Sequence, residues 1–327
     1  MKKTFNLLKK IILVCIAIVA VMIVAVFIYH QYRLNCESSL IQKKGTLIDF
    51  NGKKMNVYNE GKGKDTFVFM SGSGVAAPVY EMKGLYKKFS RSHKIAVVER
   101  AGYGYSDVFH DNRNIDTILE QTRQALIKSG NKPPYILLPH SISGLEAIYW
   151  AQKYPQEIKS IIALDIGLPN EYAKYKLGIG ESLSIRGMNL FAKLGFQRLF
   201  PTITYDPEVI KQSFLSDKEK EIFKAISYKQ AFNDDMKQEL LQNKDNARKS
   251  LKLPIPKDTP ILFLSAYTDQ NEHSKGTIEK NMDYTAFAKK LNKAEVKKVK
   301  GKHSLYLYAP DEIYDLANNF IYGKSEL

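Results

Sequence analysis

From about residue 45, short apolar segments alternate with longer helical patterns along most of this 327-residue chain. A strand followed by a helix and then another strand forms a crossover unit, so this order predicts a mostly parallel sheet with helices on both faces. Asn51-Gly52 is a strong hairpin turn and adds an antiparallel edge. Eight strands are predicted in all, at residues 47–50, 54–58, 66–70, 94–98, 135–138, 161–164, 261–264 and 294–299.

Residues 170–255 break this rhythm, because they carry several helical patterns and no clear strand. We interpret them as a helical cap inserted between two strands of the core. Pro254, Pro256 and Pro260 then mark the return of the chain to the sheet. The predicted core is therefore formed by residues 35–169 and 256–327, and residues 1–34 stand apart from it.

Residues 11–29 form an unbroken apolar run, which as a helix would rise about 28 Å, close to the hydrocarbon thickness of a bilayer. Four lysines precede the run, and only Arg33 follows it closely. By the positive-inside bias, this predicts a single-pass anchor in the cell membrane, with a cytoplasmic N-terminus and the remainder outside. A cleaved signal peptide is the alternative, although no A-x-A pattern ends the run. Asn35 before Cys36 is unlike a lipoprotein signal.

The formal net charge is +15, of which five charges lie in the first 34 residues. An excess of this size suits residence near an anionic surface or serves solubility. The lysines are dispersed and no nucleic-acid-binding motif occurs, so a nucleic-acid partner is not predicted. The two cysteines, Cys15 and Cys36, lie in and just after the apolar run, where they offer neither a disulfide framework nor a metal site.

The most informative string, residues 138–144, reads Leu-Pro-His-Ser-Ile-Ser-Gly and lies between a predicted strand and a predicted helix. A serine on such a sharp turn, here Ser141, projects its hydroxyl away from the sheet. It also lies at a helix N-terminus, where backbone N–H groups favour developing negative charge.

These residues resemble the nucleophile elbow, G-x-S-x-G, of the α/β-hydrolase family, and the resemblance extends in element order from about residue 45 to 322. It is closest to the cap-bearing, esterase-like members. The sequence departs from the pattern at Pro139 and Ser143, where the family has glycines. Ser143 is a poorer nucleophile candidate than Ser141, because centring the motif on it puts Leu145 at a crowded position.

The resemblance implies two oxyanion donors, which acyl transfer requires. One is the backbone N–H of Ile142, directly after the nucleophile. The other is expected in the loop after the third strand, where residues 71–74 read Ser-Gly-Ser-Gly and the N–H of Ser73 is the best candidate. Residues 99–106 resemble the family's D-R-x-G-x-G-x-S segment, which shapes the loop beside the pocket.

A serine needs a base, and the imidazole of that base needs a carboxylate to orient it. Of the six histidines, His303 follows the last predicted strand, where the family keeps its base. Asp269 follows the strand at residues 261–264 and matches the family's acid, giving the order Ser141, Asp269, His303. Asp165, at the end of the preceding strand, is the alternative acid, and Glu272 is a weaker rival.

Taken together, these residues predict a serine hydrolase of carboxylic esters or related acyl substrates, small or lipid-derived, that works through an acyl-enzyme. Serine at the elbow separates the chain from relatives that attack with aspartate. We expect no cofactor and no metal, since base, nucleophile and oxyanion donors suffice. A peptidase or acyltransferase on the same scaffold, and a non-catalytic membrane-tethered binding protein, remain alternatives. Substrate-binding residues are not assigned.

Overall fold

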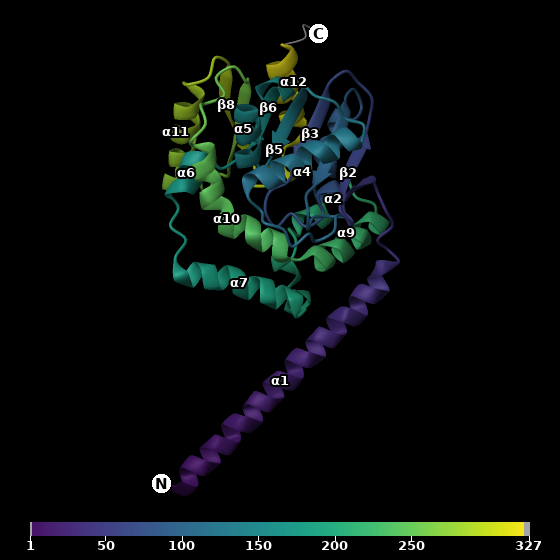
Figure 1. The fold of residues 1–327 in the computed structure, drawn as a ribbon, viewed down its shortest axis with the longest axis vertical. Coiled ribbons are helices and arrows are strands. Elements are labelled where there is room, and N and C mark those ends of the chain that lie inside the picture. The colour runs from purple at the N-terminus through teal and green to yellow at the C-terminus, as the bar shows by residue number, and fades with distance from the viewer. Residues whose placement is uncertain (1, 324–327) are drawn as a thin grey trace.

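The computed structural model describes residues 2–323 and contains one eight-stranded sheet (Figure 1). The strand order is β1-β2-β4-β3-β5-β6-β7-β8. Strand β2 pairs antiparallel with both of its neighbours, and every other pair is parallel. This confirms the predicted mostly parallel, eight-stranded sheet with a hairpin at one edge. The strands are β1 (Thr46–Phe50), β2 (Lys53–Glu60), β3 (Thr66–Met70), β4 (Lys94–Glu99), β5 (Tyr135–Pro139), β6 (Ile158–Leu164), β7 (Ile261–Tyr267) and β8 (Ala294–Lys300).

Helices cover both faces of the sheet, because successive side chains of each strand point to opposite sides. In β5, Leu137 joins one buried apolar cluster and Leu138 joins the other. The first cluster packs against α4, α5 and α11, and the second against α3 and α12. These helices, with three short ones, are α2 (Pro78–Glu81), α3 (Lys83–Phe89), α4 (Ile115–Lys128), α5 (Ser143–Lys153), η1 (Pro155–Glu157), α11 (Lys275–Ala288), η4 (Leu305–Leu307) and α12 (Pro310–Tyr322).

The chain between β6 and β7 is helical, and we call its helices the cap helices. They lie beneath the sheet in Figure 1, with α7 outermost. Helix α9 begins with a capping box between Ser216 and Glu219, and α10 packs against both α6 and α7. The cap helices are α6 (Pro169–Lys174), α7 (Ile179–Lys193), η2 (Phe196–Leu199), η3 (Pro201–Ile203), α8 (Glu208–Lys211), α9 (Asp217–Gln230) and α10 (Asp234–Ser250).

Helix α1 (Lys2–Ser38) projects from the body as a single long rod (Figure 1). It is long and apolar enough to cross a membrane, with a mean hydropathy of 3.6 over its most apolar window and none of that window buried. These properties fit a membrane anchor or a signal sequence.

The last turns of α1 contact the cap through η2. Arg198 donates hydrogen bonds to both carboxylate oxygens of Glu37, at 2.9 and 2.7 Å, and its Nε lies 2.8 Å from Nδ1 of His30. A Cβ atom on Gly195 would lie 2.3 Å from the Cβ of His30, so only glycine permits this approach. The C-terminal end of α1 is therefore fixed to the cap by buried charge and close packing.

Candidate active site

Ser141 lies on a sharp turn between β5 and α5. Its φ is +57°, in the left-handed region that a residue other than glycine rarely occupies. The turn is held by Ser143, whose hydroxyl oxygen is 2.8 Å from the carbonyl oxygens of Met70 and His140. Because Ser143 is buried and bonded within the turn, Ser141 is the serine whose hydroxyl remains available.

Glycines permit the close approaches around this turn. A Cβ on Gly144 would lie 2.4 Å from the Cβ of Ile166, so the crossing of helix and strand requires glycine there. A Cβ on Gly72 would lie 2.9 Å from the Cβ of Ser141, so the loop after β3 passes directly beside the proposed nucleophile. The small residue that this crossing needs is therefore Gly144, one position after Ser143. The hydroxyl of Ser143 instead holds the turn together.

The carboxylate that meets the imidazole of His303 is Asp165, and this corrects the expectation for Asp269. Nδ1 of His303 lies 2.7 Å from Oδ2 of Asp165, whose side chain is 6% exposed. Strand β7 continues to Tyr267, three residues past its predicted end, and pairs there with Lys300. Asp269 therefore lies beyond the sheet, with its side chain 75% exposed and 2.8 Å from Nζ of Lys300.

The second carboxylate oxygen of Asp165 is also occupied. It accepts hydrogen bonds from the backbone N–H of Ala266, at 2.7 Å, and from Nζ of Lys280, at 2.6 Å. Burial by itself would raise the pKa of Asp165, but the hydrogen bond from His303 and the charge of Lys280 outweigh it and hold the pKa below its usual range. Asp165 is thus a fixed anion facing the imidazole.

His140 supports the opposite side of His303. Its Nε2 lies 3.1 Å from the carbonyl oxygen of His303, which makes Nε2 the donor, and the two ring centroids are 4.7 Å apart. Burial, together with the nearby His303, lowers the pKa of His140 to about 3. So weak a base is unsuited to take the proton of a serine near neutral pH, and the hydrogen bond instead fixes the loop that carries His303.

A pocket of about 400 Å³ brings the core and the cap together around these groups. From the core it is lined by Ser73, Ser141 and His303, and from the cap by Thr202, Tyr205 and Asp206. Three of the predicted site residues therefore share one cavity.

Glu81 also lines this pocket and accepts a hydrogen bond of 2.7 Å from the hydroxyl of Tyr306. Burial raises the pKa of Glu81 to about 7, although the Tyr306 bond opposes the shift. The pocket thus contains a carboxyl group that changes charge near neutral pH. Neither Glu81 nor Tyr306 was assigned a role from the sequence.

The two predicted oxyanion donors belong to the nucleophile turn itself, at Ile142, and to the loop after β3, at Ser73. Within residues 2–323, no intramolecular hydrogen bond uses the backbone N–H of Ser73 or of Ile142. Ser73 lines the pocket of Ser141, whereas the side chain of Ile142 lines a separate small cavity beneath the turn. Both N–H groups therefore remain available to a ligand.

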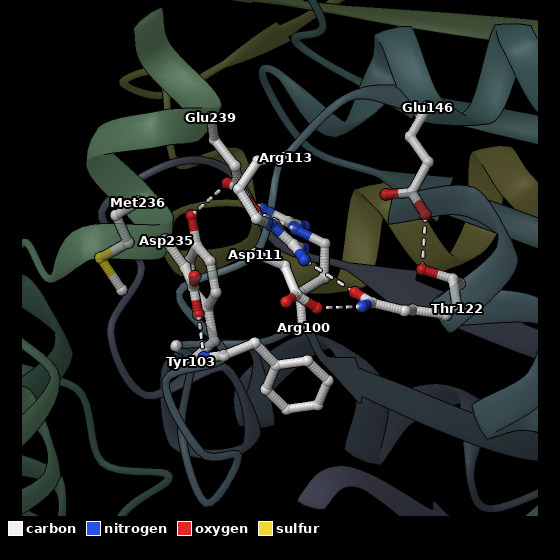
Figure 2. Close-up of polar contacts among 12 residues, drawn as sticks. Arg100, Tyr103, Asp111, Arg113, Thr122, Glu146, Asp235, Met236 and Glu239 are labelled. Carbon is white, nitrogen blue, oxygen red and sulfur yellow. Dashed lines mark hydrogen bonds and ion pairs between the residues drawn. The ribbon is translucent and has the colours of Figure 1, made fainter. Parts of the chain in front are cut away.

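The loop that carries Ser73 is braced by a buried ion cluster, drawn in Figure 2. Arg100 donates a 2.8 Å hydrogen bond to the carbonyl oxygen of Ser71 and is paired at 3.2 Å with Glu239 of the cap helix α10. The hydroxyl of Tyr103 donates to the same carboxylate at 2.7 Å. Burial would raise the pKa of Glu239, but the charges of Arg100 and Arg113 hold this pKa below its usual range. The cluster ties α10 to the core beside the oxyanion loop.

Two supporting residues were not found by sequence reasoning. Lys280 lies on α11, a helix that the sequence pattern did not predict, and His140 directly precedes Ser141 on a sharp turn, where neighbouring side chains usually point apart. The place of His140 directly before Ser141 in the elbow string was the available signal for it. Lys280 had no motif to mark it.

Among the described residues 2–323, no group of three or more His, Cys, Asp or Glu side chains is placed to hold a metal ion.

Comparison with known proteins agrees with this architecture. The chain is 60% identical to the Bacillus subtilis (strain 168) protein YbdG over 98% of its own length and 99% of that protein. Among solved structures, it resembles MGS-M2, an alpha/beta hydrolase enzyme from a Medee basin deep-sea metagenome library, with a TM-score of 0.59, 18% identity, and coverage of 86% and 98% of the two chains. It also resembles the enol-lactonase from Burkholderia xenovorans LB400, with a TM-score of 0.58, 12% identity, and coverage of 84% and 99%. At these identities the solved structures establish the fold alone. The sequence matches the family described as alpha/beta hydrolase fold over residues 72–310, and the chain belongs to that family.

Proposed function

We propose that this protein is a serine hydrolase of carboxylic esters or related acyl substrates, with Ser141 as nucleophile, His303 as base and Asp165 as the orienting acid. The observation that carries the proposal is the convergence of Ser141 and His303 on one pocket, with the imidazole fixed by a buried carboxylate. The fold family includes hydrolases, and the free N–H groups of Ser73 and Ile142 supply what an acyl transfer needs besides a nucleophile and a base.

In this mechanism, the Oγ of Ser141 attacks the carbonyl carbon while its proton passes to Nε2 of His303. The tetrahedral oxyanion is held by the N–H groups of Ser73 and Ile142. The protonated imidazole then gives its proton to the leaving alkoxide as the C–O bond breaks, which leaves an acyl-enzyme. Water repeats the sequence, with His303 again as base, and releases the acid. Asp165 keeps Nδ1 protonated throughout and stabilises the imidazolium.

A fluorophosphonate probe tests this proposal directly. We expect the full-length protein to be labelled at Ser141 and labelling to be lost in Ser141→Ala. Ser304→Ala is the matched control, because Ser304 lines the same pocket and should leave labelling intact. A folded wild-type protein that stays unlabelled, or a Ser141→Ala variant that is still labelled, would contradict the assignment. A parallel panel of p-nitrophenyl esters and aminoacyl anilides distinguishes the esterase from a peptidase.

We further propose that α1 is a retained membrane anchor with its N-terminus in the cytoplasm. Cleavage between His30 and Glu37 would remove His30 and the helix turns that present Glu37 to Arg198. The two cysteines provide the test, since Cys15 lies inside the run and Cys36 lies beyond it. A membrane-impermeant maleimide should label Cys36 on intact cells, whereas Cys15 should stay unlabelled. Labelling of Cys36 only after lysis, or a mature mass lacking the first residues, would contradict the anchor.

A further inference from the structure

We propose that an exposed apolar surface of the cap rests on the same bilayer that holds α1, so that the active-site pocket receives its acyl ester from the membrane. We call this the apolar cap surface and define it by six side chains, Ile179, Leu183, Leu190, Leu199, Phe200 and Ile203, which are all exposed. The substrate part of this inference rests on the proposed hydrolase function, whereas the contact with lipid rests only on the proposed membrane anchor.

Helix α7 presents two opposite apolar faces. Ile185 and Ala192 lie on the buried face that points into the cap. Leu183 and Leu190, two turns apart, lie on the other face and are 63% and 57% exposed. The exposed Arg186 flanks this outer face. An apolar helix stripe with a cation at its edge is typical of a helix that lies in the membrane interface.

The segment after α7 lies level with the end of the membrane-spanning run. Gly195 packs directly against His30, which is the first residue after residues 11–29. At a rise of about 1.5 Å per residue, His30 lies within a few ångströms of the end of the apolar run. The exposed Leu199, Phe200 and Ile203 follow Gly195 closely in the chain. The depth set by α1 therefore brings them to the headgroup region.

The bilayer is the favoured partner of the apolar cap surface, because α1 already holds the protein at a membrane. In Figure 1, α7 lies on the side of the body from which α1 projects. The apolar cap surface is thus continuous with the contact between α1 and η2. A second copy of the chain is the competing occupant, and the experiment below separates the two.

The pocket connects this surface to the chemistry. Ile203 belongs to the apolar cap surface and also lines the cavity that contains Ser141 and His303. An ester of an amphiphile could therefore pass from the lipid interface to Ser141 along the side of Ile203. The predicted substrate class is an acyl ester that partitions into membranes.

Lipid contact is tested with the full-length protein in vesicles. In a background of Cys15→Ala and Cys36→Ser, an environment-sensitive fluorophore is attached to Leu190→Cys or to Ile127→Cys. Ile127 is the matched control, since it is 53% exposed near the end of α4. Helix α4 leads into the amino-terminal end of β5, whereas the cap meets Ser141 beyond the carboxyl end of that strand. We expect spin-labelled lipids to quench the Leu190 probe about threefold more than the Ile127 probe. Equal quenching, or shielding of Leu190 that depends on protein concentration and not on lipid, would overturn the proposal.

The substrate inference has its own measurement. A Leu183→Ser/Leu190→Ser variant should hydrolyse a long-chain ester in vesicles about tenfold more slowly than wild type, because two apolar side chains no longer insert. Its rate on a short water-soluble ester should stay within about twofold of wild type, since neither residue lines the catalytic pocket. A parallel loss on both esters would refute the membrane route. If wild type hydrolyses neither ester, the proposed function fails, while the quenching result still decides the lipid contact.

Discussion

Asp165 and Asp269 follow neighbouring parallel strands, but the first is buried and the second is exposed. Asp165 comes directly after β6 and is buried against His303, Lys280 and the N–H of Ala266. Asp269 follows β7 and lies in solvent beside Lys300. A carboxylate after a parallel strand is thus not enough to form a catalytic acid. Burial and the direction in which the strand ends decide which of the two can fix an imidazole.

The contrast has an electrostatic side. An exposed ion pair such as Asp269–Lys300 lies in high dielectric and contributes little to stability. Asp165 is buried beside an imidazole and an ammonium group, where a missing partner leaves an uncompensated charge. We therefore expect substitutions at the two sites to differ most in catalysis, less in pH dependence and least in stability.

The largest expected difference is in turnover. Asp165→Asn should reduce kcat by about 10³–10⁴-fold, because an amide cannot keep the imidazole in the correct tautomer or stabilise its charge. Asp269→Asn, the matched change one strand away, should alter kcat by less than about twofold. Steady-state hydrolysis of a p-nitrophenyl ester measures both. A large loss in Asp269→Asn with little loss in Asp165→Asn would restore the acid expected from the sequence.

The second largest difference is expected between substitutions of the lysines that pair with the two carboxylates. Lys280→Met removes a charge that helps to hold the pKa of Asp165 below its usual range, so kcat should fall about tenfold and the acid limb of kcat/KM should move to higher pH. The other titratable groups near this cluster include His140 after β5, Glu171 and Tyr172 from α6, and Asp283 and Tyr284 from α11. Lys280→Arg should retain most of the activity, and Lys300→Met should leave the profile unchanged. A Lys280→Met profile that coincides with wild type would show that the lysine is only structural.

The stability contributed by Asp165 should depend on pH more strongly than the stability contributed by Asp269. The pKa of folded Asp165 lies below the unfolded value of 3.8, so its stabilisation is present above that pH and is lost as pH falls through the folded pKa. Asp165→Asn should therefore cost about 1–3 kcal/mol at about pH 7 and less at about pH 3. Thermal unfolding in detergent follows the gap between variant and wild type. A gap that widens on acidification would reverse the assigned sign.

The smallest effect is expected at the exposed pair. Asp269→Asn and Lys300→Met should each leave the midpoint of thermal unfolding unchanged within experimental error, because solvent screens the exposed pair. The same unfolding measurements, made in low and in high salt, check this. A clear loss of stability in either variant would mean that the end of β7 is packed more tightly than its exposure indicates.

The sequence predicts most of the fold, because strand and helix periodicity and the turn glycines are local signals. The same signals locate Ser141 and His303 at the ends of strands. They could not decide between Asp165 and Asp269, since that choice depends on where β7 ends. The pairing of Tyr267 with Lys300 lengthens β7 beyond the apolar run that marked it.

Lys280 escaped prediction for a similar reason. In α11, Gly276 and Thr277 lie in the first turn, and the buried residues are few and widely spaced, so the segment lacks a clear amphipathic pattern. Its ammonium group meets Asp165 across 115 positions of sequence, a contact that only the folded sheet brings about. Long-range pairs of this kind leave no local signal in the chain.

The contact between the C-terminal end of α1 and Arg198 of the cap has a practical consequence for preparing the protein. A soluble fragment that begins after Ser38 would lack both His30 and Glu37, leaving the guanidinium of Arg198, now 6% exposed, without its acceptors. Such a fragment would carry an unpaired guanidinium group in η2 of the cap, next to the chain segment that lines the pocket. Its behaviour in dilute buffer would then describe an altered cap, and only the intact chain reports on the native one.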